Sequence, residues 1–143
     1  MLAEYNGTVT TTTVPPTTTV PPTSTISTTT VPPTAIELSS FYAVAGSNKI
    51  KLIWTTETET NNAGFNIYRA ESEVSQYTKI NPSLIPAKGS TTQGAFYEFA
   101  DNDVQNRKTY WYKLEDIDLT GKSKMHGPVS AMPKWILGIL GKY

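Results

Sequence analysis

Residues 36–132 contain short runs in which apolar and polar residues alternate, separated by turn-forming residues. The clearest run is 49–54, where Ile50, Leu52 and Trp54 occupy every second position. This period of two predicts a half-buried β-strand. Similar patterns predict six further strands, at residues 36–44, 64–70, 77–80, 95–100, 109–117 and 123–132.

Two of the predicted strands carry irregularities. In the first, Ile36 and Leu38 share a face, but Phe41 and Tyr42 both compete for it, which indicates a β-bulge. The last is interrupted by Gly127-Pro128, which is typical of an edge strand or a bulge.

Polar and turn-forming residues separate these strands. Residues 57–63 are predicted to form a polar loop, 81–94 are expected to be mostly loop, and 119–122 form a hairpin turn. No window of ten residues carries a helical stripe. Seven short strands in about 100 residues therefore predict an all-β, immunoglobulin-like antiparallel sandwich.

Several short motifs in this region share the spacing of one domain family. They are Trp54 at the end of the second strand, residues 61–65 and 64–69, Val104 six residues before Tyr110, residues 110–114, and His126-Gly127-Pro128-Val129. Together they resemble a fibronectin type III domain of bacterial exported proteins. Asn106-Arg107 replaces the usual Pro-Gly of that family, so the corner loop departs from the common form.

The resemblance and the strand pattern together indicate which side chains form the core. The expected core residues are Trp54, Ile67, Tyr110, Tyr112 and Leu114. Trp54 is expected to fill the space between the sheets. The Tyr110 ring is expected to be buried, with its hydroxyl bound to a nearby backbone group.

Residues 8–34 have a different composition, with 14 Thr, 6 Pro and no charged residue among 27. They include three copies of Thr-Thr-Thr-Val-Pro-Pro. Paired prolines fix φ and remove backbone donors, and the apolar content is too low for a core. Residues 1–34 are therefore predicted to be an extended stalk or linker, rising about 3.1 Å per residue.

This segment has three interpretations. The first is a bare linker. The second is a stalk that carries O-linked sugars, because dense Thr beside Pro resembles glycosylated stalks. The candidate acceptors are Thr11, Thr12, Thr13, Thr17, Thr18, Thr19, Thr28, Thr29 and Thr30. Alternatively, residues 9–14 add as a strand to the sheet edge of a neighbouring subunit, since Thr and Val favour strands.

The location is predicted from the stalk and from the absence of Cys. Both are typical of an exported bacterial protein, so an extracellular or cell-surface location is expected. Residues 1–4 show no secretory signal. We expect either that a leader has been removed or that the sequence is part of a longer chain.

Charge and composition exclude several classes of function. Twelve basic and twelve acidic residues balance, which argues against nucleic-acid and polybasic membrane binding. Without Cys there is no thiolate metal site or Cys nucleophile, and a single His excludes a multi-His site. No stretch of 18 apolar residues is present, so no transmembrane helix is expected.

Three acidic clusters are the main candidates for chemistry: Glu57 and Glu59; Asp101 and Asp103; and Glu115, Asp116 and Asp118. Alternate carboxylates can bind Ca²⁺, but the middle cluster lacks the Gly and distal Glu of an EF-hand. A sandwich of this size leaves little room for a glycosidase cleft. His126 has no Gly-x-Ser-x-Gly motif to accompany it. We therefore expect a non-enzymatic protein without metal or cofactor.

Residues 134–143 follow the predicted sandwich of residues 35–133. They form an apolar tail with Trp135, Ile136, Leu137, Ile139 and Leu140. The tail either packs on the sandwich, joins it to a further domain, or docks on a partner.

The leading hypothesis is a non-enzymatic extracellular module that serves in spacing, adhesion or assembly at a bacterial surface. Its partners are then proteins or further copies of itself, bound through sheet edges, loops and exposed aromatic residues. A second hypothesis is a filament subunit that uses the N-terminal segment or the tail for contacts. A third is an accessory carbohydrate-binding domain of a secreted hydrolase, with Trp111, Trp135 and Tyr68 as its aromatic platform.

Overall fold

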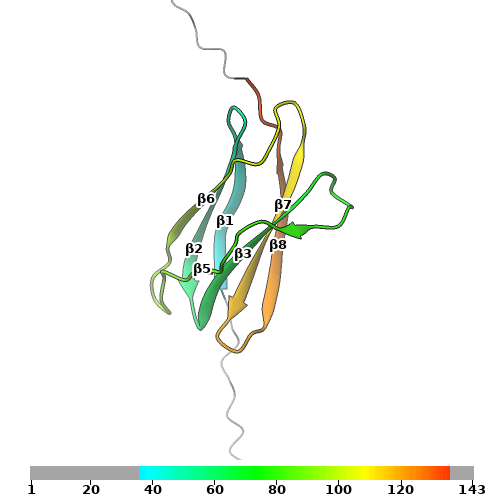
Figure 1. The fold of residues 1–143 in the computed structure, drawn as a ribbon. Coiled ribbons are helices and arrows are strands. Elements are labelled where there is room, and N and C mark those ends of the chain that lie inside the picture. The colour runs from blue at the N-terminus through cyan, green and yellow to red at the C-terminus, as the bar shows by residue number, and fades with distance from the viewer. Residues whose placement is uncertain (1–35, 136–143) are drawn as a thin grey trace, which may run out of the picture. The chain divides into compact units, whose positions relative to one another are not determined.

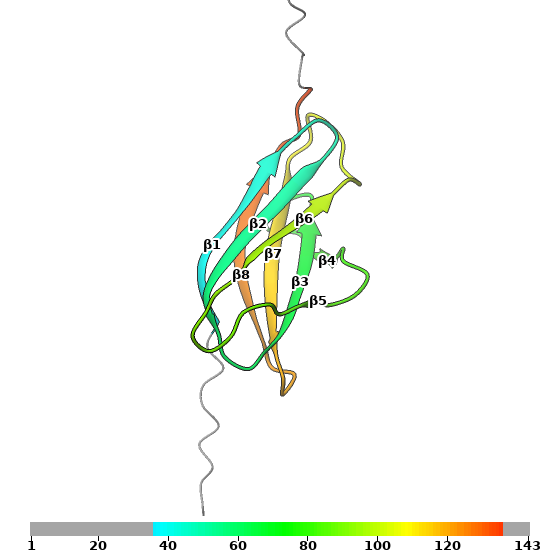
Figure 2. The ribbon, with the colours of Figure 1, turned by 90° about the vertical axis from the view of Figure 1, so that its left-hand side faces the viewer.

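The computed structural model describes residues 36–135, which form a β-sandwich of two antiparallel sheets (Figure 1). One sheet has the order β1-β2-β6, and the other has the order β4-β3-β7-β8 with β5 paired to β3. The strands are β1 (Ile36–Ala45), β2 (Ile50–Glu59), β3 (Asn62–Ala70), β4 (Thr78–Lys79), β5 (Ile85–Pro86), β6 (Phe96–Asp101), β7 (Tyr110–Asp118) and β8 (Ser123–Ala131). Figure 2 shows β1, β2 and β6 in front of β3 and β7.

The predicted all-β sandwich is confirmed, with eight strands instead of seven because β5 lies in the region expected to be loop. Within residues 36–135 there is no helix, and so none there that could cross a membrane.

The predicted loop at residues 57–63 is wrong. β2 continues to Glu59 and β3 begins at Asn62, which leaves Thr60 and Asn61 as the turn. Thr-rich sequence favours strands, and β1 pairs with β2 as far as Glu59. Asn61 adopts a positive φ of 55°, which Asn tolerates better than most residues, so two residues suffice for the reversal.

Both predicted irregularities are confirmed. The pairing of β1 with β2 shifts register on either side of Leu38. The pairing of β7 with β8 shifts between Tyr112 and Leu114, opposite Gly127-Pro128, and β8 is the terminal strand of its sheet. Gly127 has a φ of 95°, a conformation that L side chains rarely adopt.

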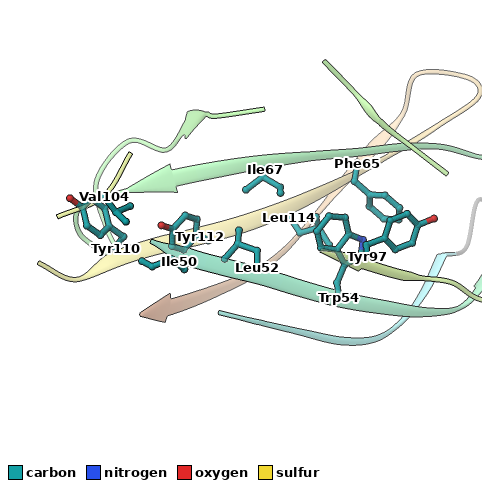
Figure 3. Packing of buried hydrophobic residues seen from close by; sticks show 10 residues of the cluster. All are labelled: Ile50, Leu52, Trp54, Phe65, Ile67, Tyr97, Val104, Tyr110, Tyr112 and Leu114. Carbon is teal, nitrogen blue, oxygen red and sulfur yellow. The ribbon is translucent and has the colours of Figure 1, made fainter. Parts of the chain in front are cut away.

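The space between the sheets is filled by ten buried apolar and aromatic residues, shown in Figure 3. The Trp54 and Tyr97 rings stack with centroids 5.1 Å apart and planes within 3°. Phe65 meets both rings edge-on, at 5.5 and 4.9 Å. Trp54, Ile67, Tyr110, Tyr112 and Leu114 all lie in this core, none more than 4% exposed.

The corner loop before β7 fixes Tyr110. The Tyr110 hydroxyl accepts a hydrogen bond from the Gln105 N–H at 3.1 Å. Arg107, which stands where the resembled family has Gly, adopts a positive φ of 68°. The Asn106 side chain accepts a hydrogen bond from the Asn48 N–H at 2.9 Å. The altered loop is therefore tied to the β1–β2 turn.

Candidate functional site

Glu59 is a buried carboxylate, only 4% exposed, at the end of β2. Oε1 accepts hydrogen bonds from the Thr56 hydroxyl at 2.6 Å and the Tyr97 hydroxyl at 2.7 Å. Oε2 accepts from the Gly89 N–H at 3.0 Å and the Asn62 amide at 3.4 Å. Burial alone would raise the pKa of Glu59, but these four hydrogen bonds outweigh it and hold the pKa below its ordinary value.

The Glu59 cluster ties loop 87–95 to the end of the sandwich. The Tyr97 hydroxyl, which donates to Glu59, also accepts a hydrogen bond from the Lys88 N–H at 2.6 Å. Burial and the nearby carboxylate raise the pKa of Tyr97, so it stays a neutral donor. Every carboxylate oxygen of Glu59 is occupied by a donor from this chain, so the cluster is structural.

Asp101 and Asp103, considered above as cation ligands, bind an arginine instead. Nη1 of Arg69 donates to both carboxylate oxygens of Asp101, at 2.9 and 3.0 Å, and Nη2 donates to Asp103 at 3.0 Å. The Tyr112 hydroxyl donates to Asp101 at 2.9 Å. Burial lowers the pKa of Arg69, but the two carboxylates raise it by more, so the guanidinium stays charged. Among the described residues no group of three acidic, His or Cys side chains could hold a metal.

His126 pairs with Asp116 across β7 and β8. Its Nε2 forms a short hydrogen bond with Asp116 Oδ2, and both side chains are 12% exposed. The Ser123 hydroxyl, three residues before His126, donates a hydrogen bond to Glu115. The His–Asp pair therefore links β8 to β7.

The structure brings two of the three proposed platform residues onto one face of the β3–β7 pair. Tyr68 lies opposite Lys113 and Trp111 opposite Ala70, so the two aromatic residues are diagonal neighbours. Both are half-buried, and Trp111 has a neighbouring strand on each side.

Glu115 lies beside Tyr68 on this face. Its Oε2 accepts hydrogen bonds from the Tyr68 hydroxyl at 2.9 Å and the Asn66 amide at 3.0 Å. Burial tends to raise the pKa of Glu115, but hydrogen bonds and the Lys79 charge hold it below its ordinary value. Glu115 is therefore an ionised acceptor at neutral pH.

Trp135 lies apart from Tyr68 and Trp111. It is 63% exposed and lines an apolar hollow of about 420 Å³ with Arg107, Met132 and Lys134. The chain there is anchored to the β1–β2 turn, because the Lys134 N–H donates to the Gly46 carbonyl at 3.2 Å. The other tail candidates, Ile136, Leu137, Ile139 and Leu140, and all the threonines proposed as glycan acceptors, lie outside the described residues.

The outer face of the β1-β2-β6 sheet carries an apolar surface that is not among the sites expected from the sequence. Tyr42, Val44 and Phe96 are 46, 45 and 56% exposed there. Tyr42 lies opposite Ile53, and Phe96 lies opposite Thr55. The alternation of inward and outward positions along each strand could have indicated this surface, because Tyr42, Val44 and Phe96 occupy the outward positions between core residues.

No family model and no curated protein matches the sequence. Among solved structures, an Fn3-like protein from Clostridium thermocellum is 18% identical with a TM-score of 0.49, over 73% of this chain and 97% of that one. A β-1,2-glucanase from Parabacteroides distasonis is 16% identical with a TM-score of 0.51, over 73% of this chain and 14% of the enzyme. The likeness to the glucanase concerns the fold, and this chain corresponds to a small part of that enzyme.

Proposed function

We propose that this protein is a non-catalytic interaction module, a fibronectin type III-like sandwich carried on a Thr/Pro stalk outside a bacterial cell. It serves in spacing, adhesion or assembly. One observation carries the proposal: the buried ionisable residues are engaged in bonds within the chain, while apolar side chains stay exposed on a sheet face. Glu59 and Asp101 illustrate the first point, and Tyr42, Val44 and Phe96 the second.

The exposed surface suits binding because it presents several apolar side chains. Large apolar patches on monomeric proteins commonly mark interaction sites. The main charged pair on this face, Lys51 with Glu98 at 3.1 Å, is internally neutralised. A partner would therefore meet mainly apolar and hydroxyl groups.

Immunogold electron microscopy of the source cells tests the proposal. Antibody against the sandwich should label unpermeabilised cells at their exterior. Labelling that appears only after permeabilisation would contradict an extracellular role. Ordered polymers carrying gold would favour the filament hypothesis over dispersed modules.

A carbohydrate-binding role is a second candidate, favoured by the neighbouring Tyr68, Trp111 and Glu115 on the β3–β7 face. Aromatic rings beside an ionised acceptor can stack on a sugar and bind its hydroxyls. The likeness to the glucanase concerns the fold and gives no support for sugar binding. The carbohydrate-binding role therefore rests on the β3–β7 face alone. Pull-down with insoluble polysaccharides tests it, and no retention above a Trp111→Ala variant would remove it.

A further inference from the structure

One edge of β6 has no partner strand among the described residues. Within the part of the chain that the structure describes, β6 pairs with β2 alone (Figure 2). The Thr56 N–H donates to the Ala95 carbonyl at 3.0 Å, so the backbone carbonyl of Ala95 points towards β2. Because antiparallel backbone groups alternate in direction, Phe96, Glu98 and Ala100 direct their N–H and C=O groups away from β2. All three residues are exposed.

A hollow of about 480 Å³ borders this edge, between β6 of one sheet and β4 of the other. These two strands do not pair with each other. Ile80, Phe99 and Ala100 supply its apolar lining. Its charged lining consists of two cationic and two anionic side chains: Arg69, Lys79, Asp101 and Asp103. The edge therefore offers unpaired backbone groups beside a partly apolar hollow whose charged side chains sum to zero.

We propose that β6 accepts an added β-strand, and that this strand is residues 9–14 of a second copy of the chain. This inference rests on the proposed role in assembly. The sequence Val-Thr-Thr-Thr-Thr-Val has six residues, as β6 does, and is followed directly by Pro15. It carries no charge, which matches the neutral hollow, and it consists of β-branched residues that favour strands.

The spacer sequence favours pairing between copies over pairing within one. Residues 15–35 separate the donor segment from β1 and contain three Pro-Pro pairs, which favour extended backbone. At about 3.1 Å per residue they span about 65 Å. A domain of about 100 residues has a radius of gyration of about 13 Å. A spacer of that length exceeds the size of the domain, so it would allow residues 9–14 to reach the β6 edge of a second copy.

Two variants test the two sides of the contact. Thr12→Pro removes a donor from the middle of the added strand without touching the sandwich. Ala100→Pro removes an outward-facing N–H that the β2 ladder does not use, at an edge position where Pro is tolerated. Thr18→Pro is the matched control, because it makes the same change outside residues 9–14.

Sedimentation velocity of the full unglycosylated chain, up to about 1 mM, should show reversible self-association. Thr12→Pro and Ala100→Pro should each weaken it at least about tenfold, or about 1.4 kcal/mol, while Thr18→Pro should leave it unchanged. A mixture of the two variants should associate, because one retains the acceptor edge and the other the donor strand.

A chain that stays monomeric up to that concentration would overturn the inference, as would association that Thr12→Pro leaves intact. A mixture that fails to associate, with both variants folded by circular dichroism, would also overturn it. Surface labelling of source cells is independent of these outcomes, so the proposed function can stand if the strand contact fails.

Discussion

Glu59 offers the sharpest test of how the sandwich is held together. Replacing it by Gln keeps the shape but removes the charge and two of the acceptor lone pairs. Glu59→Gln leaves one oxygen and one NH₂ group to face four donors, including the Thr56 and Tyr97 hydroxyls. At least two of those donors then lose their acceptor in a buried setting.

The magnitude follows from the hydrogen bonds. A bond to a charged group contributes about 1.5–3 kcal/mol, and a buried donor left unsatisfied costs about 1–3 kcal/mol. Since these contributions are not additive, we expect Glu59→Gln to lower the free energy of unfolding by about 2–4 kcal/mol at pH 7. Urea denaturation measures this loss as a lower midpoint at an unchanged slope.

The effect should depend on pH with a definite sign. The pKa of Glu59 is lowered on folding, so its contribution is fully present above its ordinary value of 4.5. That contribution is lost as pH falls below 4.5 towards the folded pKa, where Glu59 becomes protonated. The difference between the wild-type protein and Glu59→Gln should therefore narrow below pH 4.5.

A matched control is Glu98→Gln, since Glu98 is an exposed carboxylate paired with Lys51. Exposed ion pairs contribute about 0–1 kcal/mol, so this variant should unfold close to the wild-type midpoint. The account of the Glu59 cluster is wrong if Glu59→Gln and Glu98→Gln unfold at the same urea concentration at pH 7. It is also wrong if the Glu59→Gln deficit is constant with pH.

Three further variants test other parts of the fold by urea or thermal unfolding. Arg69→Met leaves the buried Asp101 carboxylate without a cationic partner and should cost about 3–5 kcal/mol; a loss below about 1 kcal/mol would refute the pairing. Tyr110→Phe removes the acceptor of the Gln105 N–H and should cost about 1 kcal/mol, and unchanged stability would count against the corner. Gly94→Ala places a Cβ 1.8 Å from the Thr56 carbonyl oxygen and should destabilise strongly, whereas Gly121→Ala meets no atom within 4 Å and should cost less.

The strands were predictable because the signal is local. Ile50, Leu52 and Trp54 show which face of β2 is buried without reference to any other part of the chain. The same is true of the β8 irregularity, since Gly127-Pro128 limits pairing wherever it occurs.

The polar clusters were not predictable because their partners are distant in sequence. The polarity of residues 57–63 predicts a loop around Glu59, but the partner of Glu59, Tyr97, lies 38 positions away. Arg69 and Asp101 are 32 positions apart, so nothing local shows that Asp101 binds a guanidinium and not a metal ion. Only the register of the assembled sheets brings such groups together.

Limited proteolysis of intact source cells tests the central claim most directly. Protease added outside should cut the Thr/Pro segment or its flanks and release a compact fragment containing residues 36–135, identified by mass spectrometry. The account predicts this fragment in the medium before any cytoplasmic marker appears. A chain that stays uncut until the cells are lysed would contradict display of the sandwich at the cell surface.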